Sequence, residues 1–203
     1  MLEILMADHT KEGYIGQVDS ADFISYADLS QLVGYSEGNL NTDVGWLSFM
    51  VDGKLVRVAK GAVRYYVTHA AMSALGLVDG KDVVIDGQLW TVRLINGTDG
   101  TPFSSEANVK IANSEWNKLF YPIVSSPTGT SPEGIVYGSQ AKLSPASIGM
   151  AGSGQGRATI CRELSSGGLI VNRGFTSVTL IAIRSDAGSV DNGRGWRPIL
   201  IRK

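Results

Sequence analysis

Apolar and polar residues alternate along two stretches of the chain, and each stretch contains an Asp-Gly pair. Residues 46–60 read WLSFMVDGKLVRVAK, with the alternation running on both sides of Asp52-Gly53. Because Asp-Gly suits the positive φ values of a type I′ turn, this pattern predicts a β-hairpin. A second hairpin is predicted where DVVI, the turn Asp86-Gly87 and QLWTVRLI follow one another.

Short helices are predicted after each hairpin. Thr68 stands where an N-cap is expected before HAAMSALG, and Gly76 lies where that helix should end. Asn113 or Ser114 is the expected cap of EWNKLF, a helix that Pro122 stops.

Short strands account for most of the remaining pattern. Segment 63–67 is one, and the C-terminal part contains ATICREL, GLIVNRG, SVTLIAIRS and GWRPILIRK. Residues 46–203 are therefore predicted to form an α+β domain of short antiparallel strands and hairpins with two short helices. Residues 124–157 form a long loop rich in Gly, Ser and Pro, and loops of this length are often functional or ordered by assembly.

Residues 1–45 show less regular patterning. A short helix is predicted at 25–33, with Ser25 as its cap and Gly34 at its end, and 36–45 is a polar linker. A segment this short cannot easily bury a core of its own, so it should either pack on the main body or dock on another chain. Burial of an apolar side chain contributes about 1.5 to 3 kcal/mol. The candidate docking residues are Ile4, Leu5, Tyr14, Ile15, Phe23 and Ile24.

Composition and charge exclude several classes of protein. The chain has 203 residues, of which 43% are hydrophobic and 18% are charged, and its formal net charge is -1. This balance favours neither nucleic acid nor an anionic membrane as a partner. The N-terminal MLEILM lacks the basic flank of a signal peptide, and no apolar run approaches the roughly 20 residues of a membrane span.

Cysteine and histidine are scarce. Cys161 is the only cysteine, so no disulfide can form within the chain, as is usual for proteins made in a reducing cytoplasm. It sits in an alternating strand, where a small buried hydrophobe is expected. The only histidines, His9 and His69, are interpreted as surface or helix-end residues, because a catalytic triad or a zinc site needs partners placed together.

Paired carboxylates could indicate glycoside hydrolysis. The pairs in this chain, Asp82 with Asp86 and Asp186 with Asp191, fall at strand starts and turns, where acids are expected anyway. We therefore predict no catalytic residue and no metal ligand.

Candidate binding residues are aromatic or lie in the long loop. Trp90, Trp116 and Trp196 occupy periodic positions and are expected in the core, whereas Trp46 stands at the linker boundary and is the most plausible exposed platform for a sugar. In the long loop, Tyr137 and Gln140 stand among small residues, a combination typical of adaptable binding surfaces. The alternative is that this loop is a mere connection.

The ordered motifs WLSFMVDGKLVRVAK, GQLWTVRLINGT, SEWNKLFYPI and GWRPILI resemble a repeated module of bacteriophage tail-fibre and virion proteins, over roughly residues 46–201. The second half is also similar, more loosely, to the C-type-lectin-like fold of the sulfatase-modifying-factor type. The matching pieces are Glu115-Trp116, Arg173-Gly174 and the final 195–197, GWR. The cysteine pair of the formylglycine-generating enzymes and the acid-rich motifs of calcium-dependent lectins are missing, so neither chemistry carries over.

These resemblances imply a non-enzymatic virion structural protein without a cofactor, located in a tail fibre, a tail tip or a head or neck decoration. It would dock on the particle by its N-terminus and present loops to the host surface. Its partners would be other virion proteins, copies of itself and a host-surface glycan or protein. The alternatives are a stand-alone carbohydrate-binding lectin-like module and, less favoured, a glycan-degrading enzyme.

Overall fold

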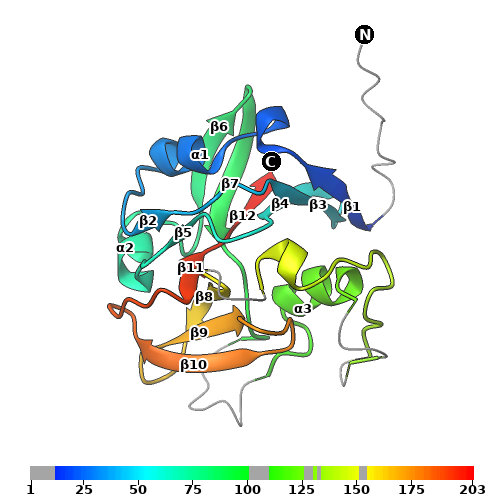
Figure 1. Ribbon diagram of the computed structural model, residues 1–203. Helices are drawn as coiled ribbons and strands as arrows, with labels where there is room; N and C mark the ends of the chain where they lie inside the picture. Colours follow the sequence, from blue (N-terminus) through cyan, green and yellow to red (C-terminus); the bar gives the residue numbers. More distant parts are fainter. Residues whose placement is uncertain (1–11, 101–109, 126–129, 132–133, 151–154) are drawn as a thin grey trace.

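The computed structural model describes residues 12–100, 110–125, 130–131, 134–150 and 155–203. They form a mixed α+β domain of two six-stranded sheets, mostly antiparallel, with a few short helices (Figure 1). The α+β class with short antiparallel strands is therefore confirmed.

The first sheet, sheet A, is antiparallel in every pairing and has the order β1-β3-β4-β12-β7-β6. Both predicted hairpins lie in it, and Asp52 and Asp86 have positive φ at their turns, as a type I′ turn requires. Its strands are β1 (Gly13–Val18), β3 (Trp46–Val51), β4 (Lys54–Ala59), β6 (Lys81–Ile85), β7 (Gln88–Leu94) and β12 (Pro198–Arg202).

The second sheet, sheet B, has the order β10-β9-β8-β11-β5-β2, and its β8–β11 pair is parallel. Only Arg197 separates β11 from β12, so the chain passes from sheet B to sheet A within one residue, as the red segment of Figure 1 shows. The strands of sheet B are β2 (Asn39–Leu40), β5 (Arg64–Tyr65), β8 (Ala158–Leu164), β9 (Leu169–Gly174), β10 (Ile181–Asp186) and β11 (Arg194–Trp196).

The helices begin at the predicted caps. Side-chain oxygens of Ser25, Thr68 and Ser114 each accept a hydrogen bond from a backbone N–H in the first helical turn. The α-helices are α1 (Tyr26–Val33), α2 (His69–Ala74) and α3 (Glu115–Phe120), and short 3-10 turns lie at Ser20–Asp22, Tyr121–Ile123 and Ala146–Ile148.

Two apolar clusters form the core. One contains Trp46, Trp90 and Trp196 together with residues of α1, and the other contains Trp116 with residues of α3. The core placement predicted for Trp90, Trp116 and Trp196 is confirmed. Since strands β3 and β4 contribute side chains to both clusters, sheet A is buried on both faces.

The N-terminal part of the chain is built into the body from residue 13 onward. Strand β1 pairs with β3, and Tyr26, Leu29 and Val33 of α1 are fully buried in the core. Of the two expectations for this segment, packing on the main body is confirmed for residues 13–45. The predicted boundary at residue 46 is therefore no break in the core, because the two sides share one sheet.

Candidate functional site

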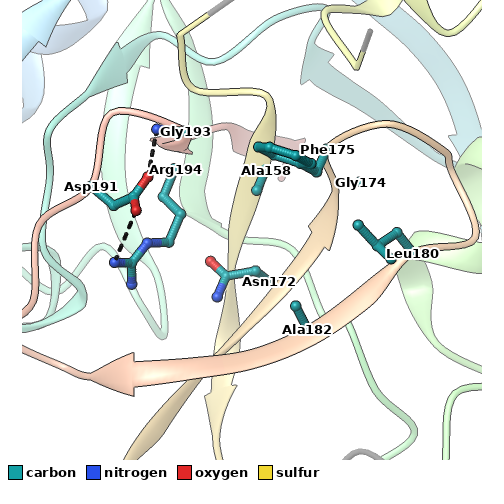
Figure 2. A pocket seen from close by; sticks show the side chains of 9 residues that line it. All are labelled: Ala158, Asn172, Gly174, Phe175, Leu180, Ala182, Asp191, Gly193 and Arg194. Atoms are coloured by element: carbon teal, nitrogen blue, oxygen red, sulfur yellow. Dashed lines mark hydrogen bonds and ion pairs between the residues drawn. The ribbon is translucent and has the colours of Figure 1, made fainter.

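A pocket of about 370 Å³ lies on one face of sheet B (Figure 2). Asn172 on β9 pairs with Ala182 on β10, and Gly174 pairs with Ala158 on β8. Because opposed residues of an antiparallel pair point to the same face, these small neighbours leave a hollow around Asn172. The lining of this hollow, here called the sheet B pocket, is Ala158, Asn172, Gly174, Phe175, Leu180, Ala182, Asp191, Gly193 and Arg194.

Two polar side chains of the sheet B pocket carry buried atoms without a hydrogen-bond partner. Asn172 is 3% exposed and Arg194 is 7% exposed. Oδ1 of Asn172 and Nη1 of Arg194 are the atoms concerned. Figure 2 shows the guanidinium of Arg194 turned toward the carboxylate of Asp191. An unsatisfied buried polar group costs about 1 to 3 kcal/mol, and because both atoms are enclosed by the protein, they lower its stability locally.

Neighbouring groups hold these two side chains in place. Nη2 of Arg194 donates a hydrogen bond to Oγ of Ser189 at 3.3 Å and lies 3.8 Å from a carboxylate oxygen of Asp191. Nδ2 of Asn172 donates to the carbonyl of Ile170 at 3.4 Å, and this contact orients the amide so that Oδ1 is the free end. The free acceptor and the free donor are thus fixed by the protein itself.

Phe175 and Leu180 form the apolar side of the pocket. Phe175 has φ of 95°, which is rare and strained for a bulky residue. The guanidinium carbon of Arg157 lies 4.0 Å from its ring centroid, and such a cation–π contact helps to hold the ring. Backbone strain of this kind gathers at functional sites, which makes the pocket the best candidate site in the described part of the chain.

Sequence reasoning missed Asn172 and Arg194. It interpreted Asp191 as a turn residue, and its carboxylate does accept a hydrogen bond from the backbone N–H of Gly193 at 2.6 Å. One signal was present in the sequence. In the strand LIVNRG, Asn172 lies on the same face as the apolar Ile170, and a polar residue at such a position needs a partner.

Trp46 does not form an exposed platform, so that prediction is wrong. Its side chain is fully buried, and its indole N–H donates a hydrogen bond to the carbonyl of Ile24 at 2.8 Å. The rings of Phe23 and Tyr26 pack edge-on against it. The segment that was expected to leave Trp46 open to solvent is the segment that covers it.

Tyr137 and Gln140 attach the long loop to the body. The ring of Tyr137 is half-buried and lies 5.0 Å from that of Tyr121, centroid to centroid. Gln140 is exposed, but its Oε1 accepts a hydrogen bond from the backbone N–H of Tyr14 at 2.8 Å. Further along the loop, Ile148 and Met150 are fully buried. These contacts attach the loop to the body, although many of its described residues are exposed, and contact between a partner and Tyr137 or Gln140 stays a prediction.

The candidate docking residues divide into two groups. Ile4 and Leu5 lie outside the described residues. Tyr14, Ile15, Phe23 and Ile24 are half-buried and pack against the two core clusters of this chain. The idea that these four lack a core is therefore wrong, because β1 and the turn before α1 place them against the two core clusters.

The cysteine and the described histidine are both enclosed. Cys161 is fully buried, as predicted, and burial raises the pKa of its thiol well above the usual value. His69 stands at the start of α2, as predicted, but it is only 4% exposed rather than on the surface. Its Nε2 lies 3.1 Å from the carbonyl oxygen of Arg162. His9 lies outside the described residues.

Residues 34–38 read GYSEG and match the G-x-S-x-G pattern that places a nucleophilic serine between a strand and a helix in α/β-hydrolases. Here the pattern follows α1 and precedes β2, the reverse of that context. The carbonyl of Ser36 accepts a hydrogen bond from Arg64, and in the described residues no histidine is hydrogen-bonded to the Ser36 hydroxyl. The match is a turn between elements.

A second hollow, of about 690 Å³, is lined in part by His69, Asn96, Arg162 and Glu163. Burial raises the pKa of the Glu163 carboxyl group. The same carboxylate accepts a hydrogen bond from the backbone N–H of Gly97 at 2.9 Å, so it satisfies the loop after β7. This hollow is larger than the sheet B pocket and is lined mainly by polar side chains, among them Asn96, whose Oδ1 is buried without a hydrogen-bond partner.

Among the described residues, no group of three or more His, Cys, Asp and Glu side chains could hold a metal ion. No helix in the same part of the chain is long and apolar enough to cross a membrane.

Comparison of the chain with protein-family models, with curated proteins and with solved structures gives no match. The pocket is therefore interpreted from its own chemistry.

Proposed function

We propose that this chain is a non-enzymatic structural protein of a bacteriophage particle that takes part in attachment to the host surface. The sequence motifs that resemble the virion module support this proposal, because the fold uses them as one framework. WLSFMVDGKLVRVAK forms the β3–β4 hairpin, GWRPILI forms β11 and β12, and β12 pairs with β4.

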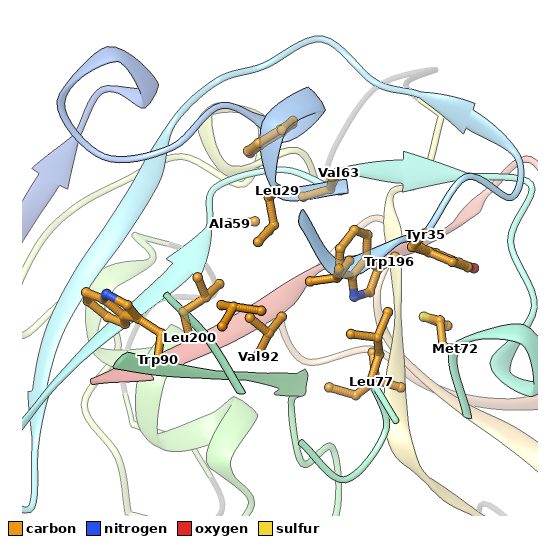
Figure 3. Packing of buried hydrophobic residues seen from close by; sticks show 14 of the residues in the cluster. Leu29, Tyr35, Ala59, Val63, Met72, Leu77, Trp90, Val92, Trp196 and Leu200 are labelled. Carbon is orange, nitrogen blue, oxygen red and sulfur yellow. The ribbon is translucent and has the colours of Figure 1, made fainter. Parts of the chain in front are cut away.

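The observation that carries the proposal is that residues from different motifs pack together in the core. Trp196 of the last motif packs in the same cluster as Trp90 of the second hairpin and Leu200 of β12 (Figure 3). Trp116 of SEWNKLFYPI lies in the other cluster with Phe49 of the first hairpin. The motifs thus specify a scaffold rather than a reactive centre.

The residues of the sheet B pocket lie outside these motifs, between SEWNKLFYPI and GWRPILI. A framework of one sequence pattern with a pocket supplied by other residues suits an attachment protein, since the recognition site can change while the core stays the same. The buried Cys161 and enclosed His69 offer no activated nucleophile, which favours a binding role.

The finer fold that we propose is C-type-lectin-like. In support, the pieces of that resemblance come together: the ring of Trp116 would lie 3.4 Å from a Cβ placed on Gly174, and Arg173 hydrogen-bonds to Asn117 on the same helix. The φ of 85° at Gly174 favours glycine at this position.

The N-terminus is the proposed attachment point. Strand β1 is an outer strand of sheet A, and residues 1–11, with Ile4 and Leu5, lead directly into it. An outer strand offers backbone groups to a strand of another chain, so we expect homo-oligomers or contacts with other virion proteins here.

The test is quantitative mass spectrometry of gradient-purified particles of the phage that encodes this chain. We expect the chain at a fixed copy number per particle, and a variant that lacks residues 1–11 should fold but be lost from particles. A chain that is found in infected cells and never in mature particles contradicts the proposal. Turnover of a glycan by the purified chain contradicts its non-enzymatic part.

A stand-alone carbohydrate-binding module remains the second candidate function. The sheet B pocket favours it, because a glycan could be bound there outside any particle. Binding of glycans together with absence from particles would support this candidate.

A further inference from the structure

Strand β6 forms one edge of sheet A, and part of its backbone points away from the sheet. Its hairpin closes at the turn Asp86-Gly87 and pairs Val84 with Leu89. The carbonyl of Leu89 accepts a hydrogen bond from the backbone N–H of Lys203, which follows β12 on the side away from β6. Because opposed residues of an antiparallel pair either bond to each other or both turn away, Val84 also directs its N–H and carbonyl outward.

These outward groups form an open sheet edge. Within the described residues, no hydrogen bond joins the backbone of Val84 to a group outside the hairpin, and the same holds for Asp82, two positions earlier. The side chain of Val84 is 59% exposed, so the described part of the chain leaves the edge uncovered at this point. An uncovered edge is a template for the addition of a further strand.

A hollow of about 610 Å³ lies beside this edge. Helix α1 is next to β6 (Figure 1), and Lys81 donates a hydrogen bond to a carbonyl of α1 at 2.9 Å. Phe23 and Ile24 are half-buried on this side, and Val84 and Leu89 form an exposed apolar pair on the other face of the hairpin. A strand along β6 therefore meets apolar surface on both of its faces. The lining of the hollow is Ser20, Ala21, Phe23, Ile24, Ser25, Asp28, Val84, Ile85 and Asp86.

The charge of the hollow is negative. Its charged lining residues are Asp28 and Asp86, which are both exposed, and neither is in an ion pair within the described part of the chain. Lys203 is in an ion pair with a carboxylate of β6 at 2.6 Å. The guanidinium carbon of Arg57 lies 5.7 Å from the centroid of the Phe23 ring, and Arg57 does not line the hollow. The hollow is thus complementary to a segment that carries positive charge.

The same charges disfavour a second copy of this chain as the added strand. If β6 paired with β6 of a second copy so that the exposed Val84 residues lay opposite each other, Asp82 would lie opposite Asp86 of the other copy. Like charges directly opposite each other destabilise a sheet. A basic strand from a different protein meets no such repulsion.

We propose that the β6 edge binds an extended segment of another protein by strand addition. The segment has apolar side chains at alternate positions and lysine or arginine residues that lie beside Asp28 and Asp86. Its backbone pairs with the outward groups of Asp82 and Val84. This interface goes beyond the proposed virion role and does not depend on it, since it rests on the edge, the hollow and the charges of the hollow.

The experiment uses the full chain and a fluorescent seven-residue peptide of alternating lysine and valine, with binding followed by fluorescence anisotropy. One comparison peptide has glutamate in place of lysine, and another has the same lysines and valines in two blocks, which keeps the charge and removes the alternation. We expect the alternating basic peptide to bind saturably and at least tenfold more tightly than either comparison. Hydrogen exchange should slow at the backbone amides of Asp82 and Val84 in the complex, with Val83 unchanged.

Variants separate the backbone from the charges. Val84→Pro removes only the outward N–H, since proline is tolerated at such edge positions, and it should weaken binding at least tenfold. Val84→Thr keeps the N–H and should bind at least threefold more tightly than Val84→Pro. The double variant Asp28→Asn with Asp86→Asn should weaken binding at least tenfold, and asparagine suits the turn as aspartate does. Val190→Thr, at an exposed valine outside the hollow, is the control and should bind as the unchanged chain does.

Circular dichroism checks that each variant is folded before its binding is compared. Folded chain that does not bind the alternating basic peptide overturns the proposal, as does undiminished binding by Val84→Pro or equal binding of the glutamate peptide. A dimer in sedimentation velocity that protects the Val84 amide assigns the edge to a second copy and also overturns it. Tighter binding of a peptide of residues 1–11 assigns the edge to the N-terminal segment, with the same consequence. The particle assay is independent of these results, so the two proposals fail separately.

Discussion

The guanidinium carbon of Arg173 lies 5.7 Å from the ring centroid of Trp116, and both side chains are fully buried. Arg173 donates hydrogen bonds to the carbonyl of Gly97 at 2.7 Å and to Oδ1 of Asn117 at 2.6 Å. The indole N–H of Trp116 donates to the carbonyl of Val178 at 2.8 Å. This pair therefore ties sheet B to α3 and to the loops on either side of it.

Removal of the Arg173 guanidinium should destabilise the protein strongly. Arg173→Met leaves the carbonyl of Gly97 and the amide oxygen of Asn117 without this donor, and each buried unsatisfied group costs about 1 to 3 kcal/mol. We expect the free energy of unfolding in urea to fall by at least about 2 kcal/mol. Arg162→Met, which removes an exposed ion pair, is the matched control and should change it by less than about 1 kcal/mol. Equal effects of the two variants would refute the structural role of Arg173.

Truncation of Trp116 tests its place in the core. Trp116→Ala should lower the free energy of unfolding by about 3 to 5 kcal/mol, because the fully buried ring leaves a cavity beside Phe120. Val84, which is 59% exposed, is the control, and Val84→Thr should stay within about 0.5 kcal/mol of the unchanged chain. The measurement is thermal unfolding followed by circular dichroism. An unchanged melting temperature for Trp116→Ala would show that the ring is not in the core.

Tyr26 should make stability depend on alkaline pH. Its hydroxyl donates to the carbonyl of Gly45 and accepts from the N–H of Gly61, both at 3.0 Å. Burial raises the pKa of Tyr26 to about 12, whereas an unfolded tyrosine titrates near 10. Since the unfolded chain releases its proton first, this contribution to stability is complete below about pH 10 and is lost as pH rises through about 12.

The variant Tyr26→Phe checks this dependence by urea unfolding at a series of pH values from 8 to 12. We expect lower stability at pH 8, because two backbone groups lose their partner, and a shallower fall of stability above pH 10. Burial also raises the pKa of Tyr35, so part of the fall of stability at alkaline pH should remain in this variant. A variant with the same alkaline slope as the unchanged chain would show that Tyr26 is not the titrating group.

Cys161 should be unreactive in the folded protein. The thiolate is the reactive form of cysteine, and burial both raises the pKa of this thiol and blocks access to it. With Ellman's reagent at pH 8, we expect no rapid reaction in buffer and one thiol per chain in concentrated guanidinium chloride. Fast labelling of the native protein would contradict the buried placement.

The sequence by itself determined the local elements of this protein. The hairpins at Asp52-Gly53 and Asp86-Gly87 and the caps Ser25 and Thr68 were predictable, because turn and cap chemistry depends on residues within a few positions of one another. For the third helix the sequence left Asn113 and Ser114 open, and the structure has Ser114. The alternating strands ATICREL and GLIVNRG were predictable too, but GWRPILIRK, predicted as one strand, is divided at Arg197 into β11 and β12 of different sheets. Strand β1 was missed, since its Gly-rich sequence GYIGQV shows no clear alternation.

Only the tertiary structure decided where individual side chains lie. Trp46 looked exposed from its position beside a polar linker, but α1 and Phe23, which lie earlier in the chain, cover it. The sheet B pocket combines Asn172 with Arg194 because β8 pairs with β9 on one edge and with β11 on the other. Burial and partnership are properties of strands that are distant in sequence, so no local pattern could bring these two residues to one pocket.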